Sequence, residues 1–262
     1  MRIFSIIFLL ISLALTACQP SEKNTIKLGV IAGPEAELAQ VAKKVAKDKY
    51  GLNIKIVEFT DYNIPNVALN DGSIDANLFQ HQPFLDETIQ KAHFKLVSIG
   101  KVFVYPMGAY SKKIKSISEL PEGAIVAIPS DPTNQTRALN LLEAANFIQL
   151  KPAVGAFPTT QDLVKNYKKL VFKPMDAALL TRILPDVDLA IINSTFAIPA
   201  GLLPNKDALL IESPNSPYAN IIVVREADKD KPQLKQLVEA FHSQEVKDAA
   251  KKLFQGQAIP AW

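Results

Sequence analysis

The sequence predicts an α/β fold arranged as two lobes, and three observations support that prediction. Apolar strand-like runs alternate with amphipathic helical stretches, which is the order of parallel β-α-β units. A strand followed by a helix of the same design begins near Ile26 and again near Ala124, which indicates one unit in each lobe. The 262 residues are 48% hydrophobic and 21% charged, an ordinary globular composition that excludes a disordered chain.

The first unit has recognisable beginnings and ends. Residues 26–31 alternate and then become fully apolar, as a strand entering a sheet does. Gly33 and Pro34 open a helix with one apolar face and one lysine-rich face, and Gly51 ends it. Residues 53–59 then form a second strand, so the chain opens as strand, helix, strand.

The same alternation continues beyond this unit. We expect short helices at 64–69 and 83–92, with a short strand at 74–79 between them. The second unit has a strand at 124–128 and a helix that reaches residue 145. These elements again predict strands covered by helices.

Two further apolar runs, 102–110 and 218–224, are placed so that they pass between the lobes. In that arrangement the first lobe contains both 25–106 and 219–262. Residues 107–218 then form the second lobe as an insertion.

The N-terminus predicts a secretory signal over residues 1–17. Arg2 precedes an apolar run that is shorter than the about 20 residues a membrane-spanning helix needs, and small residues follow it. LTAC at 15–18 matches the pattern at which a bacterial peptidase cuts before a lipidated cysteine. The alternative is an uncleaved anchor helix with a buried cysteine. The order of charge, apolar run and small residues favours the signal.

Cys18 is the only cysteine of the chain, which excludes a disulfide scaffold. With Cys18 lipidated, the folded part has no thiol for catalysis or metal binding. Residues 18–24 are polar and form a tether between lipid and fold. We therefore expect a cell-envelope protein that is held to a membrane by acyl chains and faces the periplasm or the cell exterior.

Charge and motifs exclude several function classes. The chain has 29 basic and 26 acidic side chains, which argues against nucleic acid as a partner. The stretch 232–254 predicts two helices whose lysines are interleaved with acids, as on a solvated face. His81, His93 and His242 are far apart and fit no compact metal-ligand spacing. No catalytic or nucleotide-binding motif occurs, so we expect no enzyme, no metal and no cofactor.

Asn134 and Arg137 are the first candidate ligand-binding residues. They lie three positions apart in the first turns of a predicted helix, beside backbone amides that lack acceptors within the helix. A guanidinium and a helix N-terminus together would hold a carboxylate. The alternative is that Arg137 pairs with a surface acid such as Asp131, and these residues alone leave both possibilities open.

Other candidates lie where strands end. Residues 79–84 join a strand to a helix, so His81 and its neighbours could face a crevice at the carboxyl ends of strands. In the alternative, the two phenylalanines of this segment are core and His81 is a satisfied loop histidine. Asn193 ends an apolar run and Asn220 interrupts one, which favours a specific hydrogen-bonding role for each.

Seven segments together resemble a known family over essentially the whole mature chain. They are LTAC at 15–18, DYNIPNVAL at 61–69, DANLFQHQPFL at 75–85, YPMGAYS at 105–111, IPSDPTNQTRALNLLE at 128–143, DLAIINSTFAIPAGL at 188–202 and SPYANIIVVRE at 216–226. With them the chain resembles the methionine-binding lipoproteins, the MetQ/NlpA-type substrate-binding components of bacterial methionine ABC importers. The combination of FQHxPxL, DPTNxxRAL and a late YxN is more specific than any segment alone.

This resemblance implies a type II periplasmic-binding-protein fold, in which two lobes close over one amino acid in the cleft between them. It implies an ABC permease and ATPase as partners. Arg137, assisted by Asn134, would take the carboxylate of methionine, and the remaining candidates would bind the rest of the ligand. Asn193 and Asn220 would bind the two ends of the zwitterion, and the thioether would be walled by Tyr62, Phe79, His81 and Tyr218.

Departures from the family pattern affect the ligand more than the fold. Thr136 stands where a glycine is common, Ser194 and Thr195 follow Asn193 where Asn-Gly is common, and Pro199 stands where an acid is common. The alternatives are the same fold binding another amino acid, a methionine derivative or a short peptide, a two-lobed enzyme, and a surface lipoprotein without a transport role.

Overall fold

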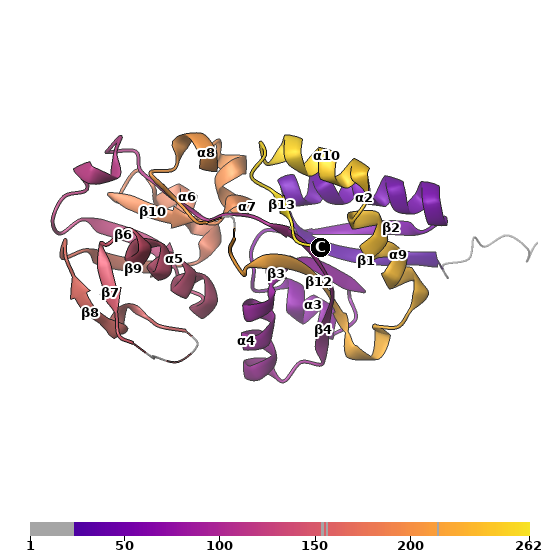
Figure 1. Cartoon of the computed structure of the whole chain (residues 1–262). Coiled ribbons are helices and arrows are strands. Elements are labelled where there is room, and N and C mark those ends of the chain that lie inside the picture. Colours follow the sequence, from indigo (N-terminus) through magenta and orange to yellow (C-terminus); the bar gives the residue numbers. More distant parts are fainter. Residues whose placement is uncertain (1–23, 153–154, 156, 214) are drawn as a thin grey trace, which may run out of the picture.

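The computed structural model describes residues 24–152, 155, 157–213 and 215–262. The predicted signal peptide, Cys18 and all of the tether except Asn24 lie outside the described residues. The fold is α/β, and two lobes lie side by side, each built around its own sheet (Figure 1). The predicted fold class is therefore confirmed.

Lobe 1 has a six-stranded sheet in the order β13-β4-β12-β3-β1-β2. The strand β1 runs parallel to β2 and β3, whereas β12 runs antiparallel to β3 and β4. The strands are β1 (Thr25–Ile31), β2 (Asn53–Phe59), β3 (Ala76–His81), β4 (Leu96–Val104), β12 (Ala219–Arg225) and β13 (Ile259–Pro260).

Helices cover both faces of this sheet. On one face α2, α9 and α10 pack together, and α3 and α4 cover the other. Their bounds are α2 (Pro34–Tyr50), α3 (Pro65–Asn70), α4 (Gln82–Ala92), α9 (Pro232–Phe241) and α10 (Gln244–Leu253). In β12, Ile222 and Val224 pack into the core with α2, α9 and α10, whereas Ile221 and Val223 pack into the core with α3 and α4. Burial on both faces explains why this strand is continuously apolar.

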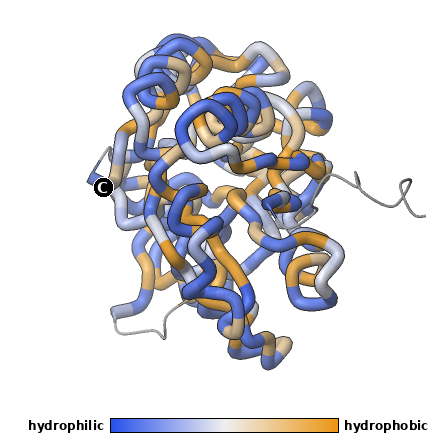
Figure 2. Tube along the Cα trace, turned by 90° about the vertical axis from the view of Figure 1, so that its right-hand side faces the viewer, coloured by the Kyte–Doolittle hydropathy of each residue, from blue (hydrophilic) through white to orange (hydrophobic). Residues whose placement is uncertain are grey.

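The helices are amphipathic, as their spacing predicted. Apolar and hydrophilic residues alternate around their turns (Figure 2). The helix α2 begins with Pro34 in its first turn and ends at Gly51, whose φ of 64° is left-handed. Gly51 donates its N–H to the Lys47 carbonyl, which satisfies one orphan acceptor of the helix end.

Lobe 2 has a five-stranded sheet in the order β11-β5-β10-β6-β9 and a separate β7–β8 hairpin. Its strands are β5 (Gly108–Tyr110), β6 (Ile125–Pro129), β7 (Ile148–Leu150), β8 (Leu163–Asn166), β9 (Val171–Met175), β10 (Leu189–Ile192) and β11 (Leu210–Ile211). Its α-helices are α5 (Pro132–Ala144), α6 (Leu180–Ile183), α7 (Ser194–Ala197) and α8 (Pro204–Asp207). The helix α5 packs in one core, and α6 and α7 pack in the other.

Two segments cross between the lobes. Residues 105–107 lead from β4 to β5, and residues 212, 213 and 215–218 lie on the return from β11 to β12. The strand β4 begins six residues before the apolar run at 102–110. Residues 97–100 are only partly buried and Lys101 is exposed, so this part of the strand leaves little apolar periodicity in the sequence. The strand β3 is likewise displaced from the predicted 74–79, and its last residue is His81.

Candidate functional site

A cavity with about 340 Å³ of space between atoms lies where the two lobes meet. Its walls come from the loop before α3, the carboxyl end of β3 with the start of α4, and the first turns of α5. The residues that follow β10, Tyr105 of the first crossing segment and the start of β12 complete them. It is lined by Tyr62, Phe79, Gln80, His81, Phe84, Tyr105, Asn134, Arg137, Asn193, Ser194, Thr195 and Asn220. Seven of the eight predicted ligand-binding residues are therefore brought together here. The eighth, Tyr218, packs directly behind the wall.

Arg137 projects from α5 and is 5% exposed. Its Nε lies 2.8 and 3.0 Å from the two carboxylate oxygens of Glu212, and its Nη2 donates to Glu212 and to the Tyr105 carbonyl. The Tyr218 ring lies 4.8 Å from the guanidinium carbon. The alternative pairing with Asp131 is not formed, because Glu212 on the returning segment supplies the acid. Arg137 is thus fixed to both crossing segments.

Asp131 instead caps α5. Its carboxylate accepts the backbone N–H of Asn134 at 2.9 Å and the Asn134 Nδ2 at 3.0 and 3.1 Å. Burial raises the pKa of the Asp131 carboxyl, and the hydrogen bonds from Asn134 and Thr133 oppose that shift. The Asn134 Oδ1 then faces the cavity side, where it accepts from Nδ2 of Asn193 at 2.9 Å.

His81 ends β3 and caps α4 with its side chain. Its Nδ1 accepts the N–H of Phe84 at 3.3 Å, and its Nε2 lies 3.4 Å from Oδ1 of Asn134. Because Nδ1 is an acceptor, the proton of the neutral ring is on Nε2. Burial, and secondarily the charge of Arg137, lowers the pKa of His81 to about 3, so the ring is neutral at ordinary pH. A hydrogen bond from lobe 1 to lobe 2 results.

Asn193 and Asn220 each offer one amide to the cavity. The Asn193 Oδ1 is buried and has no hydrogen-bond partner among the described residues. The Asn220 Nδ2 donates to Oε1 of Glu35 at 3.3 Å, and the hydroxyl of Thr195 donates to the same oxygen at 2.9 Å. Both asparagines end or lie within strands, as predicted.

Glu35 is a buried acid of the site that sequence reasoning missed. It stands in the first turn of α2, where an acidic residue is ordinary because it complements the helix dipole. Burial raises its pKa to about 8, against the effect of the Thr195 hydrogen bond. No pattern around Glu35 distinguishes it from a solvated helix start, so only its position against lobe 2 reveals it.

An aromatic cluster forms the apolar wall. Tyr62 lies 5.8, 6.1 and 5.0 Å, between ring centroids, from Phe79, Phe84 and Phe196. Phe79 and Phe84 meet edge to face at 5.7 Å. Tyr218, behind the wall, meets the His81 ring edge-on, with 4.9 Å between ring centroids. Phe84 and Phe196 were not singled out from the sequence, where their apolar surroundings resemble core.

The lobes touch on several sides of the cavity. Thr195 of lobe 2 reaches Glu35 of lobe 1, and Phe196 packs on Tyr62. At the rim, Nδ2 of Asn63 donates to Asp176 at 3.0 Å. The arrangement is therefore closed over the cavity.

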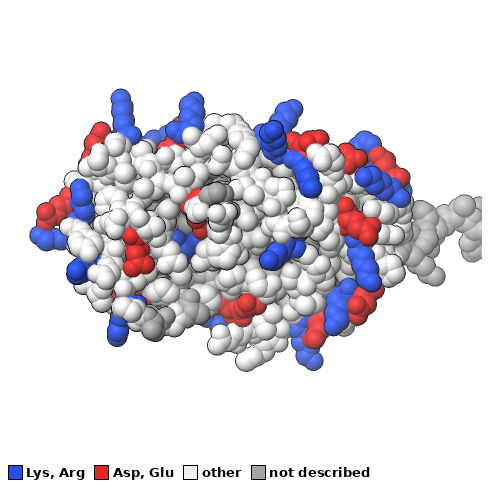
Figure 3. All heavy atoms as spheres, viewed as in Figure 1, with Lys and Arg blue, Asp and Glu red and all other residues white. Residues whose placement is uncertain are grey.

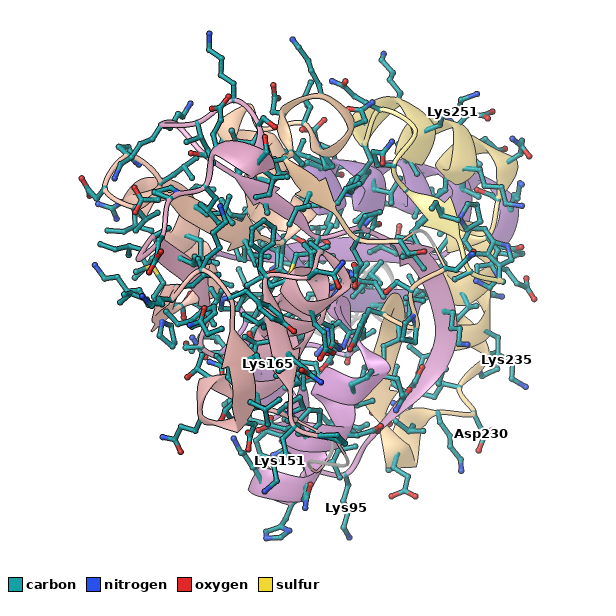
Figure 4. The ribbon with its side chains drawn as sticks, turned by 60° about the vertical axis from the view of Figure 1, so that its left-hand side comes forward. Lys95, Lys151, Lys165, Asp230, Lys235 and Lys251 are labelled. Atoms are coloured by element: carbon teal, nitrogen blue, oxygen red, sulfur yellow. The ribbon has the colours of Figure 1, made fainter. Side chains whose placement is uncertain are left out.

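Neither a metal-binding cluster nor a membrane-spanning helix occurs in the part of the chain that the structure describes. No group of three or more His, Cys, Asp or Glu side chains there could hold a metal ion. Within the same residues, no helix has both the length and the apolar character to cross a membrane. Acidic and basic side chains are interspersed over the face in Figure 3, and Lys235 and Lys251 point to solvent in Figure 4.

Comparisons with known proteins agree on one family. A Salmonella typhimurium protein named "D-methionine-binding lipoprotein MetQ" is 51% identical over 96% of this chain and 94% of its own length. A periplasmic substrate-binding protein of an ABC transporter from Coxiella burnetii matches with a TM-score of 0.88 and 57% identity, over 90% of this chain and all of that one.

A nutrient-binding protein from Burkholderia cenocepacia, solved bound to methionine, matches with a TM-score of 0.89 and 49% identity, over 90% of this chain and all of that one. The sequence profile of the NlpA lipoproteins matches residues 26–262, nearly the whole described fold. The resemblance seen in the sequence is confirmed, and the chain belongs to the NlpA lipoprotein family.

Proposed function

We propose that this protein captures methionine in the cavity between its lobes and delivers it to an ABC importer. The observation that carries the proposal is the polarity of the cavity. A buried guanidinium and an unpartnered amide oxygen lie on one side, and a cluster of aromatic rings lies on the other. A small zwitterion with an apolar side chain matches these three features, since small-molecule sites combine apolar walls with a few placed polar groups.

The carboxylate of the ligand binds Arg137 in this proposal. Glu212 and the Tyr105 carbonyl engage Nε and Nη2, and none of these hydrogen bonds uses Nη1. Nη1 is therefore the donor left for a ligand. Glu212 holds the guanidinium in one orientation, which lowers the entropy lost when the carboxylate binds.

The ammonium group binds the amide oxygens. Oδ1 of Asn193 is buried without a partner, and a buried acceptor without a donor is costly until a ligand supplies one. Asn220 lies in the same wall, and its Nδ2 is engaged by Glu35 behind it. An ammonium group supplies three donors to such a cluster.

The thioether lies among Tyr62, Phe79 and Phe84, which line the cavity and whose ring centroids are 5.7 to 6.1 Å apart. Sulfur near an aromatic ring contributes about 0.3 to 1.5 kcal/mol for each contact. The family relatives support this ligand, because one is named for D-methionine and another was solved with methionine bound.

The remaining parts of the proposal concern the setting of the protein. Removal of residues 1–17 leaves a lipidated Cys18, which tethers the lobes to a membrane surface in the cell envelope. Residues 25–106 with 219–262 act as one lobe and residues 107–218 as the other. Both close on the ligand and open to release it to the permease, without covalent chemistry.

A longer ligand is the second candidate, and a specific observation favours it. A larger hollow of about 1030 Å³, open to solvent, adjoins the cavity, and Tyr62 and Phe84 line both. Its walls carry Glu87, Asp131 and Asp176. A methionine derivative or a short peptide would extend from the aromatic cluster into this hollow.

Mass spectrometry of the small molecule released on denaturing the purified protein tests both candidates. We expect a methionine mass, and calorimetry of ligand-free protein should then give a tight complex with at least one methionine enantiomer. Release of a peptide or an S-substituted methionine would support the second candidate. Absence of binding to both enantiomers would contradict the methionine proposal.

A further inference from the structure

The orientation of the Asn193 amide follows from its hydrogen bonds. Asn193 is 7% exposed and lines the cavity, and its Nδ2 donates to Oδ1 of Asn134 at 2.9 Å. An amide has one oxygen and one nitrogen, so with the nitrogen engaged the oxygen must face the other way. Oδ1 of Asn193 has no partner among the residues that the structure describes. Which atom of Asn193 meets the ligand thus depends on Asn134.

Asp131 determines which way Asn134 faces. Both oxygens of the Asp131 carboxylate lie near Nδ2 of Asn134, at 3.0 and 3.1 Å. A carboxylate only accepts hydrogen bonds, so the nitrogen of Asn134 must face Asp131. The oxygen of Asn134 is then left for Asn193. Asp131, Asn134 and Asn193 thus form a series of hydrogen bonds. Asp131 sets the orientation of the Asn134 amide, and the Asn134 amide sets the orientation of the Asn193 amide.

His81 restrains the same amide from lobe 1. Its Nδ1 accepts from the N–H of Phe84, so Nε2 is the donor toward Oδ1 of Asn134 at 3.4 Å. A flipped Asn134 would place its nitrogen against this donor. The orientation seen is therefore the one in which all three neighbours of Asn134 are satisfied.

We propose that Asp131 is a positioning residue for the ligand's ammonium group, which acts through Asn134 to turn the amide oxygen of Asn193 into the cavity. This inference rests on the proposed function, because it takes an amino acid as the ligand. If the Asn134 and Asn193 amides were both flipped, Asn193 would present Nδ2 to the ammonium group, and two hydrogen-bond donors would face each other. Selectivity for amines over uncharged analogues then originates in an acid that does not line the cavity.

The first experiment uses Asp131→Asn, because asparagine keeps the cap of α5 as well as aspartate does. The substitution replaces one of the two oxygens near Nδ2 of Asn134 by an amide nitrogen, and so weakens the bias on the orientation of Asn134. Affinity is measured by calorimetric competition for methionine, for methionine amide, which lacks the carboxylate, and for 4-(methylthio)butanoate, which lacks the amine. We expect both amines to weaken about tenfold, as for loss of a hydrogen bond to a charged group, and the butanoate to change less than about threefold.

Asp162→Asn is the matched control. Asp162 is another lobe 2 carboxylate that caps a helical turn, through Thr159, and it does not line the cavity. We expect this variant to bind all three compounds as the wild type does. Equal weakening of all three compounds by Asp131→Asn would mean that Asp131 only supports the helix, and this would overturn the inference.

A rescue experiment separates positioning from capping. In Asp131→Asn combined with Asn193→Asp, a flipped Asn134 can donate to the new carboxylate, whose other oxygen still faces the cavity. The flip gives up only the 3.4 Å contact with Nε2 of His81, the longest hydrogen bond of the series. We expect the double variant to recover methionine affinity to within about threefold of wild type. In Asn193→Asp alone, a carboxylate oxygen faces Oδ1 of Asn134, so two acceptors meet and methionine binding weakens.

Three results would contradict the inference. Unchanged methionine affinity in Asp131→Asn, or additive losses in the double variant, would refute the inference while the proposed function stands. A wild-type protein that binds neither methionine enantiomer would refute both.

Discussion

The two lobes contribute different chemistry to one cavity. Lobe 1 supplies most of the aromatic wall through Tyr62, Phe79 and Phe84, and lobe 2 supplies the buried cation and the amides of α5 and β10. The difference follows from local structure. The start of α5 leaves backbone donors unpaired and places polar side chains in its first turns, whereas the β3–α4 junction brings Phe79 and Phe84 edge to face at 5.7 Å. Lobe 1 therefore carries most of the shape selection, whereas charge recognition centres on lobe 2 and is completed by Asn220 of lobe 1.

Removal of the cation from lobe 2 gives the largest expected effect. We predict that Arg137→Ala weakens methionine binding at least about 100-fold, since a hydrogen-bonded charge pair is lost and Glu212 remains buried without its partner. Calorimetry measures the affinity, and circular dichroism checks the fold. Arg225→Ala is the matched control, because Arg225 also pairs with acids but lies in lobe 1 away from the cavity. Unaltered binding in Arg137→Ala would invalidate the assignment of the carboxylate site.

Glu35 is a buried acid of lobe 1 and makes stability depend on pH. Its folded pKa is about 8 against an ordinary value of 4.5, so between these values the native state holds a proton that the unfolded state releases. Its contribution to stability is present below pH 4.5 and is lost as the pH rises through 8. We predict that wild type loses roughly 2 to 4 kcal/mol relative to Glu35→Gln between pH 5 and pH 8.

Urea unfolding of both proteins at the two pH values measures this difference. His81 acts with the opposite sign, because its folded pKa of about 3 makes the native state resist protonation as the pH falls. The His81 effect is common to both proteins and cancels in the comparison. A pH-independent difference between wild type and Glu35→Gln would show that Glu35 is ionised in the native state.

A change to the aromatic wall should affect the side chain of the ligand and leave its charged end. We predict that Phe84→Leu weakens methionine binding about fivefold, which corresponds to about 1 kcal/mol for a ring contact. The binding of norleucine, which lacks the sulfur, should weaken less. The ratio of methionine affinity to norleucine affinity, measured by calorimetry, should therefore become smaller. An unchanged preference would place the thioether elsewhere.

The rim contact between the lobes should matter least. The hydrogen bond from Asn63 to Asp176 joins the lobes at an exposed site, where such contacts contribute little. We predict that Asn63→Ala changes methionine affinity less than about twofold. A large loss would mean that the rim, rather than the cavity, holds the closed arrangement together.

Much of the fold followed from local patterns. The β1–α2–β2 unit was predictable because alternation, a proline start and a glycine stop all act over a few residues. The hairpin β7–β8 and the start of β4 were not, because partly buried strands carry weak periodicity and depend on partners distant in sequence. The positions of Asn193 and Asn220 were visible as polar interruptions of apolar runs.

The sequence by itself determined the α/β class, the family, and which polar residues stand at strand ends and helix starts, since these depend on short-range spacing and on recognisable segments. Only the tertiary structure decided that Glu212 pairs with Arg137, that Glu35 lies against Thr195, and that one atom of Asn193 faces the cavity. Those contacts join residues 75 and 160 positions apart, or depend on the direction of a hydrogen bond, and neither property leaves a periodic trace in the chain.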